Sequence, residues 1–142
     1  MSAHEFFIRV YYEDTDAAGI VYYANYLKFA ERARTELLRM VGFSQEKLCA
    51  QGGPVFAVKR CEVEFVAPAR LDDELVVESR LLTLGGASLE VDQRVRRAGS
   101  DLARLVVRVA CVGPHGHPQR LPKPLRAALE RFVPKVEERN AR

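Results

Sequence analysis

The sequence predicts an α+β domain in which one long helix packs against an antiparallel sheet. From about residue 22 to residue 41, apolar residues recur at intervals of three and four, as on a helix with one buried face. After the break at Gly52–Pro54, apolar and polar residues alternate in several short segments, as on strands with one buried face. The connectors between these segments are short and rich in turn-forming residues, which favours antiparallel neighbours. One helical layer on one sheet accounts for both patterns.

A first strand is predicted at residues 5–12, because aromatic and β-branched residues dominate this run. Its inward face would carry Phe6, Ile8, Val10 and Tyr12. The strand ends at residues 13–19, where three carboxylates, Thr15 and Gly19 are typical of a turn. The long helix follows, from about Tyr22 to Val41, and is closed by Gly42. Its length of about 30 Å would cross a small sheet.

Four further strands complete the predicted sheet, and two short helices accompany them. A helix at residues 44–48 has Ser44 as its N-cap. The strands are expected around Cys61–Phe65, Leu75–Leu84, Leu89–Arg96 and Ala103–Cys111. A last helical pattern runs from Leu125 to about Val136. Because the open edges of such a sheet commonly pair with another copy, we expect a homodimer or a homotetramer.

Length and composition predict a single domain spanning residues 1–142. Hydrophobic residues make up 48% and charged residues 29%, which argues against a disordered, collagen-like or coiled-coil chain. No run approaches the roughly 18 apolar residues that a membrane helix needs, so no integral membrane contact is expected. The first residues lack the basic and apolar segments of a secretion signal. Three cysteines without close spacing predict neither a disulfide framework nor a zinc site, and the reducing cytoplasm is the expected compartment.

The net charge of +3 arises at the C-terminal end of the chain. Residues 118–142 hold seven Lys or Arg and three Glu, and the remainder is close to neutral. A nucleic-acid-binding protein would more often carry a basic stripe interleaved with aromatic residues, which this sequence lacks. We therefore expect no nucleic-acid partner, and a solvated helix face explains the basic end.

Asp16 is the strongest candidate for a catalytic residue, because it lies between the first strand and the long helix. Helix capping is the commoner role of a carboxylate at such a place, where it meets unpaired N–H groups. Gly19 nearby permits close approach of the backbone to a ligand. The N–H groups around Tyr22 and Tyr23 would point at a bound carbonyl oxygen. Such donors would form an oxyanion hole beside the Asp16 carboxylate.

Residues 11–26 read Tyr-Tyr-Glu-Asp-Thr-Asp-Ala-Ala-Gly-Ile-Val-Tyr-Tyr-Ala-Asn-Tyr. This stretch resembles the signature of the hotdog-fold acyl-CoA thioesterases of the 4-hydroxybenzoyl-CoA thioesterase superfamily. Three further segments resemble the branch associated with the Tol-Pal cell-envelope system, namely Glu31–Glu36, Val66–Asp73 and Leu121–Pro124. The resemblance covers nearly the whole chain. It implies a hotdog fold, in which a five-stranded antiparallel sheet wraps a long central helix.

The resemblance also implies an enzyme that hydrolyses an acyl-CoA thioester to CoA and a free carboxylic acid. Asp16 would be the nucleophile or the general base, and the backbone N–H of Tyr23 would polarise the thioester carbonyl. Gly19 would keep the approach open. Members of the family pair their sheets into dimers, with the site at the dimer interface. Because a thioester is already an activated acyl group, the reaction needs no metal and no organic cofactor.

Further residues are expected to contact the substrate. The Tol-Pal branch often has His where this sequence has Tyr23, whereas the 4-hydroxybenzoyl-CoA branch has Tyr, so aliphatic and aromatic acyl groups both stay open. Tyr22, Asn25 and Tyr26 are candidates for an acyl or aryl pocket, and core packing is an equal alternative for the tyrosines. Basic candidates for the CoA phosphates are Lys59, Arg60, Arg70 and Arg94. Ser88 is a candidate contact to the pantetheine arm.

Other chemistries fit the sequence less well. A Ser-His-Asp triad needs a placed histidine, but His4 lies near the terminus and His115 and His117 lie in a Pro/Gly loop. No third ligand accompanies the last two, so no metal site is expected. A hotdog dehydratase would need a His beside its acid. Cys61 and Cys111 are expected to be buried as small apolar residues. The remaining alternative is a non-catalytic module that binds acyl-CoA or acyl-carrier protein at the cell envelope.

Overall fold

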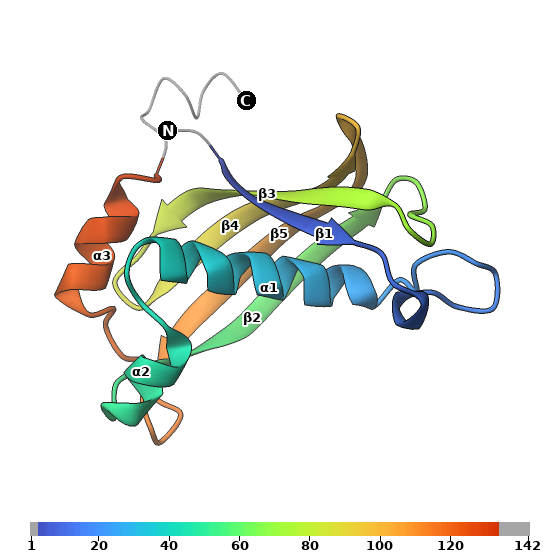
Figure 1. The fold of residues 1–142 in the computed structure, drawn as a ribbon. Coiled ribbons are helices and arrows are strands. Elements are labelled where there is room, and N and C mark those ends of the chain that lie inside the picture. The colour runs from blue at the N-terminus through green and yellow to red at the C-terminus, as the bar shows by residue number, and fades with distance from the viewer. Residues whose placement is uncertain (1–2, 134–142) are drawn as a thin grey trace.

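The computed structural model describes residues 3–133, which form a five-stranded antiparallel sheet curled around one long helix (Figure 1). The strands are β1 (His4–Arg9), β2 (Val55–Phe65), β3 (Glu74–Leu84), β4 (Ser88–Arg97) and β5 (Ser100–Val112). The helices are α1 (Asn25–Met40), α2 (Gln45–Ala50) and α3 (Lys123–Glu130), with a 3₁₀ turn at Tyr12–Asp14. This is the hotdog fold, so the predicted α+β class and the five-stranded sheet are confirmed.

The order of strands in the sheet is β1-β3-β4-β5-β2. The first strand therefore pairs with β3, in a register that runs from His4 opposite Ser79 to Arg9 opposite Glu74. The central strands β3, β4 and β5 follow one another through tight hairpins, as the short connectors predict. Strands β1 and β2 are the two edges of the sheet.

Helix α1 lies across the concave face of the sheet (Figure 1). Its buried residues are Tyr26, Phe29, Ala30, Ala33 and Leu37, which lie on the predicted apolar stripe. The sheet contributes alternate residues of each central strand, including Leu75, Val77, Leu81, Val91, Val95, Leu105 and Val107. The side chain of Gln93 is fully buried beneath the helix and donates hydrogen bonds to Ala30 O and Ser79 Oγ, both at 2.9 Å. This amide ties α1 directly to β3 and β4.

The first strand is shorter than predicted. It ends at Arg9, and the chain then turns, because the Asp14 carboxylate accepts a hydrogen bond from the Tyr11 N–H at 2.8 Å. Val10 is buried as expected, but the Tyr12 side chain is 83% exposed, so its predicted place on the inward face was wrong.

The long helix begins three residues later than predicted, at Asn25. Residues 22–24 form a turn instead, in which the N–H of Asn25 donates to Tyr22 O at 2.8 Å. The Tyr22 N–H donates back to Asp14 O at 2.9 Å, which holds this segment against the preceding loop. The predicted N-cap of α2 is confirmed, since Ser44 Oγ accepts from the Lys47 N–H at 3.1 Å.

Two further predictions differ from the structure. Strand β2 is exposed along most of its length, and Cys61 is exposed with it, whereas Cys111 on β5 is buried as predicted. The reason is position, because β2 is an edge strand that α1 covers only in part. Helix α3 begins at Lys123 and ends at Glu130, and the last predicted helical residues, 134–136, lie outside the described residues.

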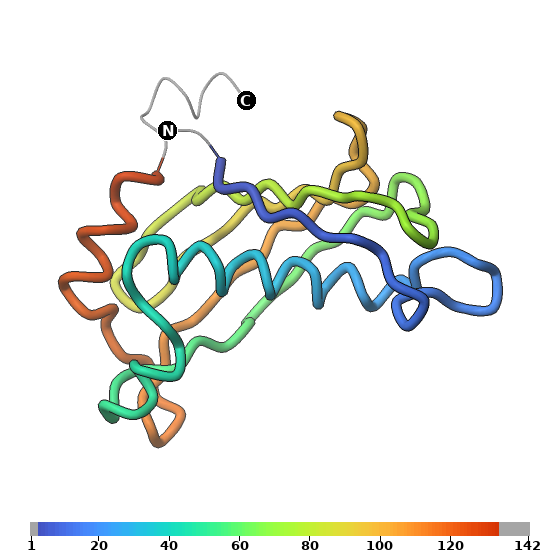
Figure 2. Tube along the Cα trace, viewed as in Figure 1, coloured from blue at the N-terminus to red at the C-terminus, as the bar shows by residue number. Residues whose placement is uncertain are grey.

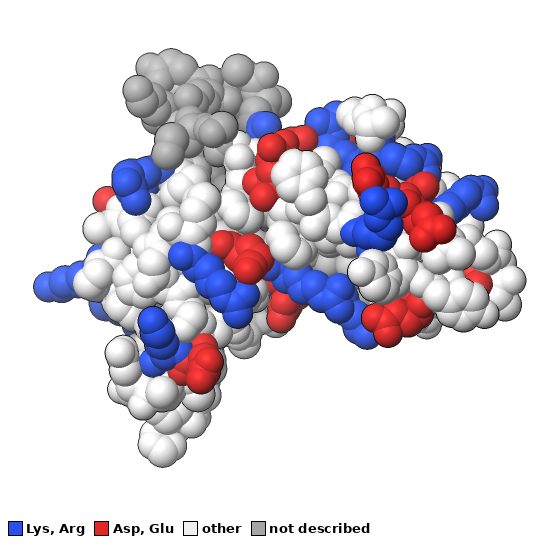
Figure 3. All heavy atoms as spheres, in the orientation of Figure 1, with Lys and Arg blue, Asp and Glu red and all other residues white. Residues whose placement is uncertain are grey.

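Lys, Arg, Asp and Glu are mixed over the visible surface, whereas the end that carries the loop before α1 is largely uncharged (Figure 3). Several ion pairs join neighbouring strands, including Arg96 with Glu78 and Arg104 with Glu64. Within residues 3–133, no helix has the length and apolar character needed to span a bilayer.

Candidate active site

Asp16 lies at the start of a small hairpin that precedes α1. Thr15 pairs with Val21, and the Asp16 N–H donates to Ile20 O at 2.9 Å. The Gly19 N–H closes the turn on Asp16 O at 3.0 Å, and Gly19 has φ +79°. A left-handed residue at this point suits glycine, so the turn itself requires Gly19. A Cβ at this glycine would meet no protein atom within 4 Å, so the space beside it is open.

The carboxylate of Asp16 is exposed, and one of its oxygens is occupied. Oδ1 accepts a hydrogen bond from the Ala18 N–H at 2.8 Å, which fixes the side chain over the turn. Oδ2 has no hydrogen-bond partner among residues 3–133. The alternative role of helix capping does not hold for Asp16, because α1 begins nine residues later and Ala24 is at its N-cap position.

Three aromatic side chains, Tyr22, Tyr23 and Phe65, form an exposed cluster at this end of the molecule, which we call the aromatic corner. The ring centroids of Tyr22 and Tyr23 lie 4.9 Å apart, and those of Tyr23 and Phe65 lie 6.0 Å apart, edge to face. A hydrogen bond with the Tyr23 hydroxyl raises the pKa of Tyr22, and the Asp16 carboxylate adds a smaller upward effect. Because Val21 pairs with Thr15 and the Tyr22 N–H donates to Asp14 O, the aromatic corner adjoins the hairpin that carries Asp16.

Backbone donors are available where the turn enters α1. The N–H groups of Tyr22, Asn25 and Tyr26 all donate to backbone carbonyls. Those of Tyr23 and Ala24 have no hydrogen-bond partner within the described chain. The Asn25 side chain donates to Asp14 O at 2.8 Å and so locks the loop onto the helix. Asp14 O also accepts the Tyr22 N–H. These two hydrogen bonds tie the loop that carries Asp16 to the start of α1.

Tyr26, another of the substrate-contact candidates, is a core residue. Its side chain is 3% exposed and packs against Phe29 and Phe65, and its hydroxyl accepts from the Ala69 N–H at 3.0 Å. Burial raises the pKa of this hydroxyl, against a smaller opposing effect of the Ala69 hydrogen bond. The core-packing alternative therefore describes Tyr26, and we remove it from the residues expected to contact substrate.

A sequence model described as the thioesterase superfamily matches residues 18–103, which is more than half of the chain. This chain belongs to the thioesterase superfamily. It is 44% identical over 123 residues to the acyl-CoA thioesterase YbgC of Haemophilus influenzae, which covers 86% of this chain and 90% of that protein. It is 46% identical over 125 residues to the acyl-CoA thioester hydrolase YbgC of Escherichia coli, with 87% and 92% covered.

Among solved structures, a probable thioesterase from Bartonella henselae superposes with a TM-score of 0.81. It is 38% identical, and the match covers 85% of this chain and 100% of that one. The family expected from residues 11–26 is therefore confirmed for this member of the superfamily.

The remaining candidates of this thioesterase-superfamily chain are scattered. Arg70 is exposed and bridges to Ile20 through its backbone, so it lies beside the Asp16 loop. Arg60 lies on β2, where it pairs with Glu62 at 2.6 Å. Ser88 begins β4, directly after the β3–β4 turn that Arg126 of α3 contacts through Gly85 O. This turn lies at the end of the sheet opposite the loop before α1 (Figure 2). Lys59 lies at an irregularity of β2, and Arg94 pairs with Asp92 and Asp101 on the sheet. Of these five residues, Arg70 is the one that lies beside the Asp16 loop.

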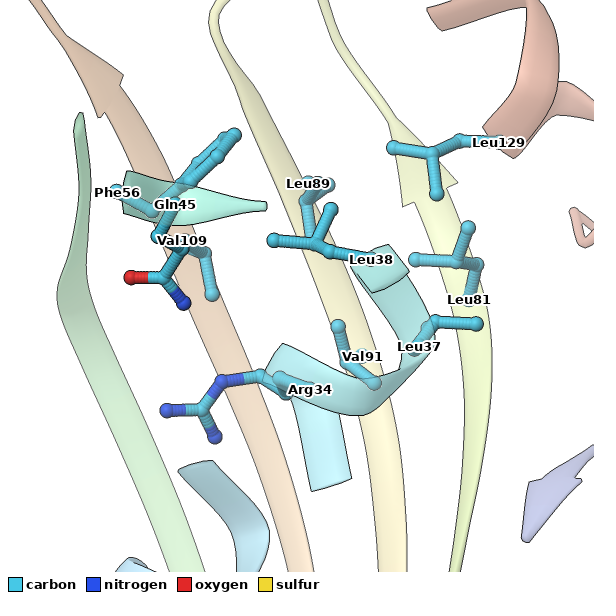
Figure 4. A pocket seen from close by; sticks show the side chains of 10 residues that line it. All are labelled: Arg34, Leu37, Leu38, Gln45, Phe56, Leu81, Leu89, Val91, Val109 and Leu129. Carbon is cyan, nitrogen blue, oxygen red and sulfur yellow. The ribbon is translucent and has the colours of Figure 1, made fainter. Parts of the chain in front are cut away.

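Two hollows lie along α1. A small apolar pocket of about 50 Å³ lies between the C-terminal half of α1 and the sheet, with Arg34 and Gln45 at one side (Figure 4). Arg34, the lining residue of α1 nearest to its start at Asn25, lies about 14 Å along the helix from it at 1.5 Å per residue, so the pocket is separate from the Asp16 loop. A larger groove of about 590 Å³ runs between α1 and β2. Its lining includes Leu27, Lys28, Arg34, Val58 and Cys61.

Sequence reasoning missed two residues at this end of the molecule. Phe65 was assigned only to a strand, yet its ring completes the aromatic corner. Arg97 was not considered, yet it holds the loop on which the Asp16 hairpin rests, through an ion pair with Asp73 at 2.6 Å. The segment Val66–Asp73, which resembles the family, was given no role, although it contains Asp73, the partner of Arg97.

Proposed function

We propose that this chain is an acyl-CoA thioester hydrolase whose catalytic group is Asp16. One observation carries the proposal, namely a carboxylate with an unoccupied oxygen in a rigid hairpin, joined to a helix start with unpaired N–H groups. Relatives at 44% and 46% identity that are named as acyl-CoA thioesterases support the same activity.

The proposed mechanism needs only two groups of this chain. The thioester oxygen lies against the Tyr23 N–H, which stabilises the negative charge that develops on it. As general base, Asp16 removes a proton from a water that attacks the carbonyl carbon, and the C–S bond breaks to release the carboxylic acid and the CoA thiolate, which takes up the proton. As nucleophile, Asp16 attacks the carbonyl carbon itself, C–S cleavage releases CoA, and water then hydrolyses the acyl anhydride left on Asp16 to free the carboxylic acid. One such backbone donor is typically worth about 2.7–4 kcal/mol of transition-state stabilisation. Gly19 fixes the turn, while Tyr22, Asn25 and Arg70 are the proposed substrate contacts nearby.

We also propose that two copies pair through β2. This strand is an edge of the sheet, and its apolar residues Val55, Val58 and Phe65 are exposed. An exposed edge strand of 11 residues is a ready template for another strand. A second copy there would also cover the groove beside α1, and Arg60 and Ser88 would contact substrate only from that copy. Three free cysteines, two of them exposed, are compatible with the cytoplasm as the compartment.

The activity is tested by release of free CoA from short aliphatic, long aliphatic and aromatic acyl-CoAs. Asp16→Asn retains an oxygen for the Ala18 N–H and is expected to lower kcat by at least about 100-fold. Glu13→Gln, a neighbouring exposed carboxylate without a role in the mechanism, is the matched control and is expected to leave the rate unchanged. Equal rates in all three proteins would remove Asp16 from the mechanism. Binding of acyl-CoA without turnover by the wild type would favour the non-catalytic binding module.

Pairing through β2 is tested by sedimentation velocity of the wild type and of Val58→Arg. The wild type is expected to sediment as a dimer or a larger assembly, and the variant as a monomer with reduced activity. A wild type that sediments as a monomer and hydrolyses acyl-CoA as fast as Val58→Arg does would contradict the pairing.

A further inference from the structure

The segment Val66–Asp73, which we call the strap, pairs with the Asp16 hairpin through its backbone. The Val21 N–H donates to Ala69 O at 2.8 Å, and Ile20 forms a bridge with Arg70. Both contacts lie on the returning half of the hairpin, whose Ile20 O accepts the N–H of Asp16 at 2.9 Å. Figure 2 shows the strap and the loop before α1 at the same end of the molecule. The position of Asp16 therefore depends on the position of the strap.

Asp73 and Arg97 hold the strap in place. Arg97 Nη1 donates to Asp73 Oδ2 at 2.6 Å, and the same oxygen accepts the Arg70 N–H at 2.8 Å. Arg97 Nη1 also lies 3.4 Å from Pro68 O, so one guanidinium contacts the strap at both Pro68 and Asp73. The Tyr26 hydroxyl adds a third fixed point through the Ala69 N–H.

The ion pair between Asp73 and Arg97, which we call the clamp, offsets an unfavourable backbone conformation in the strap. Asp72 has φ +68°, a left-handed conformation that costs a residue with a Cβ free energy. The Asp73 N–H donates to Arg70 O at 3.1 Å, so residues 70–73 form a tight turn with Asp72 at its third position. Hydrogen bonds from Arg70 and Arg97 keep the pKa of Asp73 below its ordinary value, although burial acts in the opposite direction. The carboxylate is therefore charged when it holds the turn.

Arg97 is itself fixed by a tight hairpin. It pairs with Ser100 across a two-residue turn, in which Ala98 has φ +48° and Gly99 has φ +83°. Both left-handed values are those of a type I′ turn, whose twist matches the flanking strands. Arg97 is thus anchored in the β4–β5 hairpin, where β4 pairs with β5 along its whole length.

We propose that Asp73 and Arg97 are positioning residues for Asp16, acting through the strap. Neither side chain needs to touch the substrate. The proposal rests on the proposed function in one respect, because one of its two readouts is thioester hydrolysis.

The kinetic test uses Asp73→Asn, Arg97→Gln and the conservative Arg97→Lys. Loss of the clamp is expected to lower kcat by about 10- to 100-fold with little change in KM, since small displacements of a catalytic group have effects of this size. Arg97→Lys keeps the charge and is expected to restore part of kcat. Arg39→Gln removes an exposed ion pair with Glu36 near the C-terminal end of α1 and is expected to leave kcat unchanged. All rates are measured well below each variant's melting temperature.

The second readout is hydrogen exchange at the Val21 and Asp16 amides, which does not depend on catalysis. The clamp variants are expected to exchange these amides faster than the wild type does, whereas Arg39→Gln is expected to exchange them at the wild-type rate. Unchanged exchange in both Asp73→Asn and Arg97→Gln would overturn the proposal. Faster exchange with an unchanged kcat would also overturn it if Asp16→Asn is inactive. If Asp16→Asn is fully active, the proposed function fails, and exchange alone then decides whether the clamp holds the hairpin.

Discussion

The guanidinium of Arg34 donates a hydrogen bond to the side-chain oxygen of Gln93 at 2.9 Å, and no carboxylate pairs with it among residues 3–133. Burial lowers the pKa of Arg34, with a smaller opposing effect of Glu31. The arginine therefore depends on a neutral amide, which in turn is held by Ala30 O and Ser79 Oγ. A chain of polar contacts thus crosses an otherwise apolar core between α1 and the sheet.

Replacing Gln93 by Ala is expected to lower the free energy of unfolding by about 3 kcal/mol. The change leaves the Arg34 donor and Ser79 without their partner and removes buried volume. Urea unfolding followed by circular dichroism measures the loss. Gln45→Ala is the control, because Gln45 is exposed and its side chain bonds Thr35 alone within residues 3–133, and its cost should stay below about 0.5 kcal/mol. Equal costs for the two variants would contradict a structural role of the Gln93 contacts.

Phe65→Ala is expected to raise KM for acyl-CoA about fivefold while changing kcat little. Edge-to-face contact with Tyr23 is worth about 1 kcal/mol, and its loss frees the aromatic corner that we expect to meet the substrate. Steady-state kinetics measures both constants. Phe7→Ala on β1 is the matched control, since that ring is 72% exposed at the other edge of the sheet. An unchanged KM in Phe65→Ala would remove the aromatic corner from substrate binding.

Ala98→Asn is expected to stabilise the protein by about 0.5–1 kcal/mol. Asn tolerates the φ of +48° at this position better than Ala does and is favoured before Gly in a type I′ turn. Thermal unfolding measures the gain. Ala17→Asn, at an exposed turn position without a positive φ, is expected to show no comparable gain. A lower melting temperature for Ala98→Asn would mean that the turn is held by contacts of the alanine methyl.

His4 is expected to make stability depend on pH below its ordinary pKa of 6.5. Burial lowers the pKa of His4, against smaller upward effects of Glu36 and Glu5, and its Nδ1 has no hydrogen-bond partner in the described part of the chain. The folded state thus binds a proton more weakly than the unfolded chain does. The contribution of His4 is complete above pH 6.5 and is lost as the pH falls toward the lower, folded-state pKa.

Urea unfolding at about pH 8 and about pH 5.5 checks this linkage. The wild type should lose more stability between these values than His4→Gln, which cannot titrate. An identical loss in both proteins would assign the pH dependence to other groups.

Features that depend on local pattern were predictable from the sequence. The stripe of α1 that includes Ala30, Ala33 and Leu37 is buried as its spacing predicts, and Ser44 caps α2. The exposure of Cys61 was not predictable, because alternation along a strand does not say whether that strand is an edge or is fully covered. The early end of β1 depends on the hydrogen bond between Asp14 and Tyr11, which competes with further strand pairing.

In the candidate site, too, residues of a local motif were predictable and residues brought in by the tertiary fold were not. Asp16 and Gly19 belong to one continuous motif and were identified together. Phe65 and Arg97 approach that motif only through the sheet, so no local spacing marks them. Ser88 was chosen from local sequence alone, and the topology places it at the far end of the same copy.

The pairing of β1 with β3 and the joining of the Asp16 hairpin to the strap both depend on parts of the chain that are synthesised later. His4 pairs with Ser79, so the first strand has no complete partner until the ribosome has synthesised the chain as far as Ser79. The strap, which lies between β2 and β3 in the sequence, is complete only a few residues earlier. During synthesis, α1 therefore leaves the ribosome long before the surface that will bury it, and contacts of this sequence separation form slowly. The Asp16 hairpin can close on itself through local contacts, but its hydrogen bond to the strap can form only after Ala69 has been made.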